Sequence, residues 1–594
     1  MSTAGGADGD DDAVGPVRLV ARVVPDVTGL DKHFDYLVPE ALADQVRVGS
    51  LVRVMLHGRR VGGWVVAVSP LLGNEVPCGA VARTAVDPAR LVELAKFSSC
   101  GPAASLVDLA SWAATRWGVA RVRPFLGAAS PDTMVRVRGA SRRTIVPDDR
   151  PAWNGVHHLA PLTDPLAIVI DAARRGPTIA LHPSPLAARA LARRLRAAGL
   201  TVAVAPDEWA AADAGVDVVV GSRVAAWAPC EGLRAVVVLD EHDEGYQEER
   251  SPTWNAREVA VERASRAGAS CVLTSPCPSA TALHWAGDRV VDAGAADPSG
   301  WSTIEIDDRT DVEPWRRSMI GSRLIELLRD PTRRVACVLN TTGRARLVAC
   351  RSCRALQRCE RCAAAVAVDD DANFSCARCA TTRPQVCGGC GATAMANVRP
   401  GVTRLREELE AAAGRPVALV AGDSDSPVVV ESADVFVGTE AVLHRVGSVD
   451  TVVFLDLDSE LLAPRYRAHE HVMALVVRAV RRVGAASRGG RVLVQTHLPD
   501  HEVVSAIGSC DLRDVVRGEL ASRAALGLPP FGALAAVEGP GADEFVANLD
   551  LVAARTAKGH LVRADDWLTL GSALAAAPRT RGSAVRVAVD PPRA

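Results

Sequence analysis

The sequence predicts an α/β protein built from several domains. Short Val-rich runs alternate with amphipathic helical stretches in two separate parts of the 594-residue chain. The first part contains the predicted strands PTIALHP and LRAVVVLDEHDEGY and the predicted helix PLAARALARRLRAAG. The second part contains RPVALVAG, ADVFVGT and VDTVVFLDLD. Such alternation is typical of parallel sheets covered by helices, so the two sets indicate two RecA-like lobes.

Length and composition set outer bounds on this prediction. A chain of 594 residues is expected to form three or more domains, because single cores seldom exceed about 250–300 residues. The net charge of −2 supplies no overall basic field that would favour nucleic acid. No apolar run has transmembrane length and the start lacks a signal-peptide pattern, so we expect a cytoplasmic protein with no membrane partner. The polar, acidic residues 1–16 are expected to form a disordered tail.

Eight of the fifteen cysteines lie in four CxxC pairs within a single stretch of the chain. A CxxC turn directs two thiolates at one ion, and four thiolates complete a tetrahedral structural zinc site. A disulfide framework is the alternative, but it is uncommon in intracellular chains. We therefore predict two Zn²⁺ ions per chain, held in closed sites that stabilise structure and do no chemistry. The predicted ligands are Cys350, Cys353, Cys359, Cys362, Cys376, Cys379, Cys387 and Cys390.

Residues 17–88 are predicted to be rich in β-strands, with the Val-rich runs VRLVARVV, SLVRVML and RRVGGWVVAVS. Between the first two runs lies the segment Phe34–Pro39, FDYLVP. Its Phe and Tyr have the chemistry to stack on a nucleobase, although a strand that fills a small barrel is an equally good interpretation. Residues 103–127 show helical spacing, and residues 130–165 are rich in Pro, Arg and Asp, which is typical of a linker.

The order of these segments resembles the PriA family, replication-restart helicases of superfamily 2. FDYLVPE resembles the 3′-end DNA-binding domain of the family, and VVVGSRVAAWAPCEGLRAVVVLDEHDEGYQ resembles the stretch that leads into its DEEH box. ADVFVGTEAVLHRVGSVDTVVFLDLDSELLAPRYRAHEH precedes the position of the arginine finger, and LGLPPFGALAAVEG matches a closing segment. The resemblance implies binding to forked or branched DNA and 3′ ends. It also implies contacts with other primosome or replication proteins by a monomer.

The resemblance also implies how the chain is divided. The expected units are a disordered acidic tail at 1–16, a β-rich 3′-end DNA-binding domain at 17–95, a helical, winged-helix-like module with a linker at 96–160, helicase lobe 1 at 161–300, helicase lobe 2 at 301–348 and 392–512, the two-zinc module at 349–391, and a C-terminal α+β domain at 513–594.

The chain departs from the family at the phosphate-binding loop. A P-loop needs Gly-Lys followed by Ser or Thr, because its amides and lysine hold phosphate and its hydroxyl binds Mg²⁺. The only lysines are Lys32, Lys96 and Lys558, and none stands in that context. The place expected for the loop, before PTIALHP, reads LAIVIDAARRG, whose arginines we expect at a solvated helix end. The sequence therefore argues against binding of ATP and Mg²⁺.

The other motor motifs differ as well. In the alignment that the resemblance implies, Leu239-Asp240-Glu241-His242 takes the place of the DEEH box, and Arg478–Ala485 that of the arginine-finger motif. Arg482 persists there, but the final arginine is Ala485, and loss of that charge costs roughly 10³–10⁵ in rate. We expect a degenerate nucleotide site at Asp240, Glu241, His242 and Arg482 and no catalysis. A residual metal or hydrolase site among these acids is the alternative.

Further site residues follow from the resemblance. Phe34, Asp35, Tyr36 and Gly58 match the family's pocket for a 3′-terminal nucleotide, with Asp35 accepting a hydrogen bond from the 3′-hydroxyl. The family's pocket lysine has no equivalent, because Gly79 and Ala80 occupy that region. Nested zinc pairing would place Cys350, Cys353, Cys387 and Cys390 around an outer ion and Cys359, Cys362, Cys376 and Cys379 around an inner one.

Three functions agree with these observations. We favour a catalytically inert scaffold that binds abandoned or stalled forks and 3′ ends and assembles a primosome. An active ATP-dependent 3′→5′ helicase with an unconventional nucleotide site is the second. A zinc-containing protein-interaction platform that does not bind DNA is the third. The arginines of the cysteine stretch form either a basic face for DNA or protein or a solvated surface: Arg351, Arg354, Arg358 and Arg361.

Overall fold

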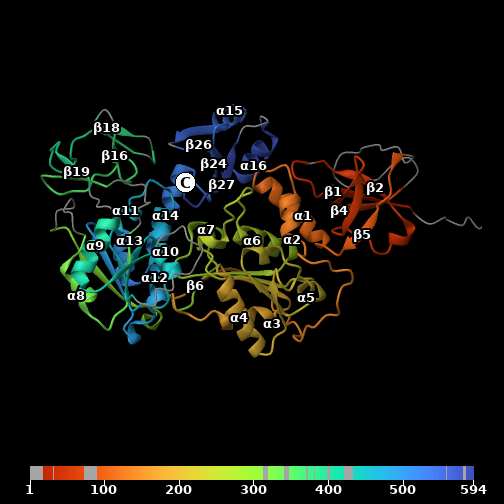
Figure 1. The fold of residues 1–594 in the computed structure, drawn as a ribbon, viewed down its shortest axis with the longest axis horizontal. Helices are drawn as coiled ribbons and strands as arrows, with labels where there is room; N and C mark the ends of the chain where they lie inside the picture. The colour runs from red at the N-terminus through yellow and green to blue at the C-terminus, as the bar shows by residue number, and fades with distance from the viewer. Residues whose placement is uncertain are drawn as a thin grey trace, which may run out of the picture.

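The structure is a computed structural model (Figure 1). It describes residues 18–30, 32–71, 90–311, 319–339, 347–369, 372–376, 378–379, 381–397, 402–420, 433–556, 558–579 and 584–593. The predicted acidic tail and the pair Gly79 and Ala80 lie outside these residues.

The N-terminal unit is a five-stranded antiparallel sheet of order β2-β1-β4-β3-β5. Alternation along each strand turns one set of side chains, including Val23, Val54 and Val65, into a common core. The last strand follows residue 95, so this sheet extends past the expected domain boundary. The strands are β1 (Leu19–Pro25), β2 (Phe34–Val38), β3 (Leu51–Leu56), β4 (Arg59–Pro70) and β5 (Lys96–Ser99).

Two helices, α1 (Ala104–Arg116) and α2 (Arg123–Ala129), connect this sheet to the rest of the molecule (Figure 1). At the end of α1, the Arg116 guanidinium lies 3.6 Å from the centre of the Trp567 ring, in the C-terminal domain. It also pairs with Glu258 of lobe 1 at 2.5 Å. A buried arginine needs such a carboxylate partner, so Arg116 joins three parts of the fold.

Lobe 1 is a seven-stranded sheet of order β12-β6-β11-β10-β7-β9-β8, in which every pair is parallel. Its central strands are buried along their whole length, as expected for a sheet covered on both faces. Its elements are β6 (Asn154–His158), α3 (Leu166–Arg174), β7 (Thr178–Leu181), α4 (Pro185–Ala197), β8 (Val202–Ala205), α5 (Trp209–Ala214), β9 (Val218–Gly221), β10 (Ala235–Val238), α6 (Ala256–Ala267), β11 (Ser270–Ser275), α7 (Ala280–Ala286) and β12 (Val290–Asp292).

Lobe 2 is a second parallel sheet, of order β13-β23-β22-β14-β21-β20. The two sheets confirm the predicted α/β multidomain fold with two RecA-like lobes. The elements of lobe 2 and the helices that follow it are β13 (Thr303–Asp308), α8 (Ser322–Arg329), β14 (Val335–Val338), α9 (Val402–Ala413), β20 (Val417–Val420), β21 (Val435–Gly438), α10 (Ala441–Arg445), β22 (Thr451–Phe454), α11 (Asp458–Leu461), α12 (Ala468–Val483), β23 (Arg491–Thr496), α13 (Glu502–Ser509) and α14 (Arg513–Leu526).

The cysteine stretch is inserted in lobe 2 between β14 and α9, as predicted. It forms short strands: β15 (Val348–Cys350), β16 (Ala367–Val368), β17 (Asn373–Ser375), β18 (Thr382–Pro384) and β19 (Met395–Asn397). The Ala365 N–H donates to the Leu462 carbonyl, which ties this module to lobe 2.

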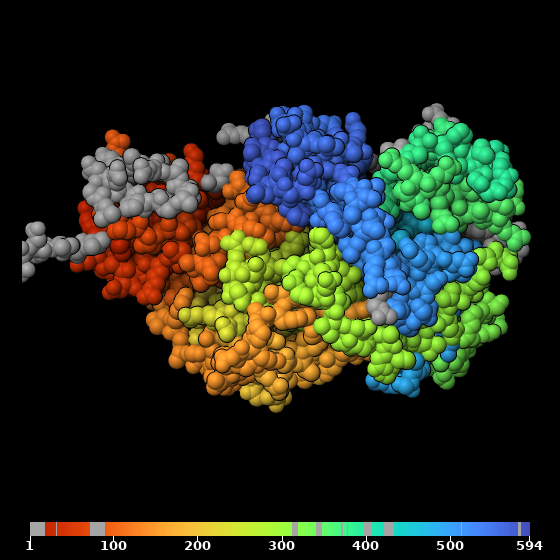
Figure 2. Space-filling view, turned by 180° about the vertical axis from the view of Figure 1, so that it is seen from behind, coloured from red at the N-terminus to blue at the C-terminus, as the bar shows by residue number. Residues whose placement is uncertain are grey.

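The C-terminal domain is an antiparallel sheet of order β25-β26-β24-β27 with two helices. It lies between the helical module and the cysteine module, over the junction of the lobes (Figure 2). Its elements are β24 (Ala533–Glu538), α15 (Ala542–Ala547), β25 (Val552–Thr556), β26 (Gly559–Ala564), α16 (Trp567–Ala576) and β27 (Arg586–Val589). Within the described residues, no helix has both the length and the apolar character needed to cross a membrane.

Candidate functional site

A nucleotide site in such a fold would lie at the carboxyl ends of the strands of lobe 1, where it faces lobe 2. The strand-to-helix turn after β6 is LAPLTDP, residues 159–165, which contains neither glycine nor lysine. The prediction that LAIVIDAARRG replaces the loop was wrong, because this segment is helix α3 and its end. Two amides of the real turn are already bonded: Leu162 N–H donates to the Gly300 carbonyl and Thr163 N–H to the Ala160 carbonyl.

The Arg481 side chain of α12 in lobe 2 reaches this turn. Its Nε donates to the Pro161 carbonyl at 2.8 Å, and its two terminal nitrogens lie 2.5 and 2.6 Å from the carboxylate oxygens of Asp240. Burial by itself raises the pKa of Asp240, but the Arg481 guanidinium holds it at about 2. The Arg481 guanidinium therefore lies where a bound phosphate would need a cation.

The other predicted residues of the degenerate site make internal contacts. Glu241 is buried and accepts hydrogen bonds from Arg257, at 2.9 Å, and from the Ser279 amide, at 2.6 Å. Nδ1 of His242 lies 2.7 Å from the Ser275 hydroxyl, and burial lowers the pKa of His242, which favours the neutral ring. These groups support the junction of β10 and β11.

Arg482 does not reach Asp240, Glu241 or His242, because its guanidinium donates to the Leu443 carbonyl inside lobe 2. Arg481 and Arg478 point to lobe 1 instead, and Arg478 pairs with Asp243 at 3.0 Å. Sequence reasoning missed Arg481, although the replacement of the motif's glycine by a cation was a visible signal.

A cavity of about 60 Å³ lies between the lobes beside these residues, with Glu244, Glu470, His471 and Arg467 in its lining. Since one water needs about 10–15 Å³ of such space, it has room for a few waters.

The eight cysteines of the insertion form two groups, with the pairing that the family resemblance implies. Their Sγ atoms lie 3.4–3.5 Å apart in the closest pairs, and within each group all four lie within 4.8 Å of one another. Four thiolates around zinc, each about 2.3 Å from the ion, lie about 3.8 Å apart, whereas a disulfide holds its sulfurs at about 2.05 Å. The donor set therefore fits zinc. The groups are Cys350, Cys353, Cys387 and Cys390, and Cys359, Cys362, Cys376 and Cys379.

Backbone geometry favours the thiolate form of Cys387. The Gly389 N–H and the Gln357 amide donate to Cys387 Sγ, at 3.4 and 3.3 Å. Burial raises the pKa of Cys387, but hydrogen bonds from the Gly389 and Cys390 amides contribute to lowering this pKa to about 6. Thiolates are the form that binds zinc.

The four predicted basic residues of the module are exposed, but two of them are also bonded. Arg351 Nε donates to the Met395 carbonyl and an Arg354 terminal nitrogen donates to the Asp311 carbonyl. Arg358 and Arg361 are exposed on the same stretch.

The residues predicted to bind a 3′ end lie on β2 and the β3–β4 hairpin. Tyr36 is 4% exposed and its hydroxyl donates to the Met55 carbonyl at 3.1 Å, so it fills the core of the sheet. Phe34 is half-buried on the same face. Asp35 points to the other face and pairs with Arg22, directly opposite on β1, through contacts of 2.9 and 3.1 Å. The two aromatic rings do not form an exposed stacking pair in this structure.

Gly58 has a backbone role. Leu56 and Arg59 pair across the hairpin, which leaves His57 and Gly58 as a two-residue turn with φ angles of +48° and +76°. A turn with both central residues at positive φ matches the twist of a hairpin, and glycine adopts that conformation without strain.

Asp458, at the start of α11, is expected to make the stability of lobe 2 depend on pH. Its carboxylate is 2% exposed and accepts hydrogen bonds from the Thr496 hydroxyl and the His497 amide, and burial raises its pKa to about 7. Because the pKa in the folded state lies above that of the unfolded chain, stability is lost as pH rises through 7. The free energy of unfolding of Asp458→Asn, relative to that of the wild type, is therefore expected to increase by roughly 2 kcal/mol between pH 5.5 and 8.

Urea unfolding of lobe 2, followed by hydrogen exchange in β22 and β23, measures this difference. Asp434→Asn is the control, since that side chain is 57% exposed. A difference between Asp458→Asn and wild type that stays constant over this pH range would contradict the prediction.

Comparison with known proteins shows similarity to PriA proteins. The family model of the PriA 3′DNA-binding domain (3′BD) matches residues 22–118. The probable replication restart protein PriA of Mycobacterium tuberculosis is 28% identical over 591 residues, which cover 86% of this chain and 85% of the relative. The chain is similar to PriA proteins along most of its length.

Other PriA proteins match over shorter stretches. The replication restart protein PriA of Haemophilus influenzae is 25% identical over 338 residues, which cover 53% of this chain and 46% of that protein.

A solved structure of Saccharomyces cerevisiae Dbp5 with RNA and ADP BeF3 is 13% identical over 63% of this chain and 90% of its own, with a TM-score of 0.35. RecG bound to a three-way DNA junction has a TM-score of 0.33 at 12% identity, over 63% and 44% of the two chains. Likeness at this level supports no conclusion about function.

Proposed function

We propose that this chain is a replication-restart protein that recognises abandoned forks and DNA 3′ ends and scaffolds primosome assembly without unwinding DNA. Similarity to PriA proteins over 86% of the chain and the match to the PriA 3′DNA-binding domain support the DNA-binding part. The observation that carries the rest is the contact of Arg481 with both Asp240 and the turn after β6.

A nucleotide would have to displace this contact and would gain little in return. Phosphate recognition relies on free amides at a helix N-terminus and on a lysine. Here the turn has no lysine, and its Leu162 and Thr163 amides donate to carbonyls. Leu239 stands at the position of the family's metal-binding Asp, and the neighbouring Asp240 is neutralised by Arg481. We infer that the chain neither binds nor hydrolyses ATP at this cleft.

We assign recognition of the 3′ end to Phe34 and Asp35. Phe34 is half-buried, so a modest shift of the strand exposes its ring to a terminal base. Asp35 keeps acceptor capacity, because a carboxylate has about four lone-pair sites and its pair with Arg22 fixes its orientation. Tyr36 supports both residues from the core.

Two structural Zn²⁺ ions complete the proposal. The two Cys₄ groups hold them in closed sites, so they stabilise the module and take no part in chemistry. The exposed arginines Arg358 and Arg361 then present a local basic surface to DNA phosphates or to an acidic partner protein.

Fork binding and ATP hydrolysis test this function together. Phe34→Ala is expected to weaken binding to a fork with a free 3′ end about 5- to 100-fold, the value of one stacked base. Phe97→Ala is the matched control, since Phe97 is another half-buried aromatic of the same sheet. Fluorescence anisotropy with forks that carry a 3′-hydroxyl or a 3′-phosphate measures the effect, with an ATPase assay on the same forks.

The outcomes separate the three functions. DNA-stimulated turnover of a few ATP per second would show an active helicase. Unchanged binding by Phe34→Ala would remove the assignment of the 3′ pocket, and absence of fork binding by the wild type would favour a protein-interaction platform.

A further inference from the structure

Ion pairs join the two lobes across the cleft at several points. Arg481 of lobe 2 pairs with Asp240 of lobe 1, and Arg478 pairs with Asp243 at 3.0 Å. Both arginines lie on α12, one helical turn apart, so a single rigid helix carries both cations to the loop after β10. Rotation of one lobe against the other would break both pairs together.

Asp240 adopts an unusual backbone conformation to make its contact. Its φ is +54°, in the left-handed region that non-glycine residues seldom occupy. The same carboxylate is buried, and a buried carboxylate is costly unless it is paired. The backbone of the loop after β10 therefore fits the arrangement in which Arg481 contacts Asp240.

The end of the chain forms a third connection. Asp590 accepts from the Tyr466 hydroxyl at 2.7 Å and from Arg467 at 2.8 Å, both in lobe 2. The preceding residue, Val589, exchanges two hydrogen bonds with Thr253 of lobe 1. Segment 589–593 is thus bound to both lobes.

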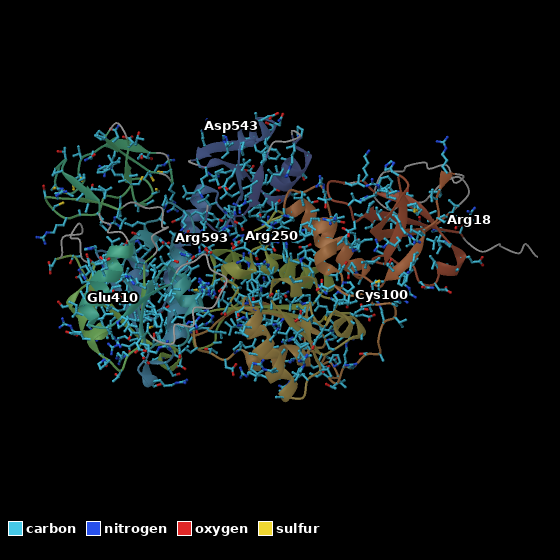
Figure 3. All side chains as sticks on the ribbon, in the orientation of Figure 1. Arg18, Cys100, Arg250, Glu410, Asp543 and Arg593 are labelled. Atoms are coloured by element: carbon cyan, nitrogen blue, oxygen red, sulfur yellow. The ribbon has the colours of Figure 1, made fainter. Side chains whose placement is uncertain are left out.

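Arg593 lies beyond these contacts, at the junction of the lobes and the C-terminal domain (Figure 3). It pairs with Glu244 of lobe 1 at 2.9 Å and with Glu440 of lobe 2 at 2.6 Å. Without a cation between them, these two carboxylates would repel each other across the cleft. Arg593 removes that repulsion in the way that a bound cation would.

We propose that these contacts form an interlobe latch that keeps the two lobes in one closed arrangement with no nucleotide bound. The latch consists of Arg481 with Asp240, Arg478 with Asp243, and Arg593 with Glu244 and Glu440. Opening the lobes would separate each cation from its carboxylate, and a carboxylate that stays buried without its partner is costly. The chain itself supplies the closure that bound nucleotide supplies between motor lobes. This inference is independent of DNA binding and stands if fork binding fails.

Single-molecule energy transfer between the lobes tests the latch. Labels at Leu186 on α4 and Glu326 on α8, introduced through an unnatural amino acid because the chain has many cysteines, report the distance between lobes. The wild type is expected to show one distance that millimolar Mg²⁺-ATPγS does not change. Arg478→Asp combined with Arg593→Ala is expected to shift the population about tenfold toward a longer distance.

Two further variants control for unfolding and for charge. Adding Asp243→Arg to Arg478→Asp restores that pair with reversed sign, so it is expected to recover most of the wild-type distance; circular dichroism checks that each variant is folded. Arg189→Gln and Arg517→Gln are matched controls, since these arginines are exposed and lie away from the cleft. A wild type that samples two distances, a distance that changes with ATPγS, or latch variants that keep the wild-type distance would each overturn the proposal.

Discussion

Replacement of Cys376 by Ser is expected to release the inner zinc and to unfold the part of the cysteine module around it, while the outer cysteine group and the two lobes stay folded. The module depends on metal because its strands span only two or three residues and its own apolar cluster is small. Cys376 is 3% exposed and belongs to both the ligand group and that cluster, next to the buried Phe374 ring. Structural zinc contributes about 10–16 kcal/mol to the folding of small zinc domains, far more than this core supplies.

Zinc content and hydrogen exchange measure this result. The wild type is expected to bind two zincs per chain and the variant one, with loss of exchange protection confined to residues 359–384, around the inner cysteine group. Cys510→Ser is the matched control, because Cys510 lies at the end of α13 outside both cysteine groups. Two zincs in Cys376→Ser, or none in the wild type, would contradict the assignment.

Replacement of Arg523 by Met is expected to cost roughly 3–5 kcal/mol of stability, because it removes the cation that pairs with the buried Glu519 and the partly buried Glu470. Arg523 is 1% exposed on α14, where it pairs with Glu519 at 2.8 Å and with Glu470 at 3.0 Å. Glu470 also accepts from the Ala280 amide of lobe 1, so the loss reaches the contact between the lobes.

The effect of Arg523→Met depends on pH in a defined direction. Burial raises the pKa of Glu519, and the charge of Arg523 opposes this rise. Removal of Arg523 therefore raises the pKa of Glu519 further. A raised folded-state pKa means that stability falls as pH rises, so the variant is expected to be most unstable above pH 7 and to recover toward pH 5. Urea unfolding at both pH values measures this.

Arg517→Met is the control on the same helix. Its side chain is 75% exposed and its partner Asp514 is 93% exposed, so its loss is expected to change little. Equal effects of the two substitutions would show that burial of Arg523 does not matter.

Much of the fold was predictable from short-range patterns. Val-rich strands alternating with helices predicted both parallel sheets, because burial on both faces leaves a continuous apolar run in the sequence. The CxxC spacing predicted the cysteine groups, because ligands of one ion must lie close together in the chain or in paired turns. The scarcity of lysine excluded a P-loop, since that chemistry needs one specific residue.

The candidate site was less predictable. Arg482 was the expected arginine, yet Arg481 reaches the cleft, because neighbouring residues on a helix point about 100° apart and only the packing of α12 decides which one faces lobe 1. Phe34 and Tyr36 were expected as a pair, but the depth of β2 in the sheet buries Tyr36.

The sequence by itself determined the two α/β lobes, the inserted cysteine module and the absence of a P-loop, because each depends on residue type and local spacing. Only the tertiary structure decided that Arg481 contacts Asp240 and that Arg593 bridges Glu244 and Glu440. These partners are separated by more than 150 residues, and a charge at one position does not indicate which distant charge the fold will bring to it.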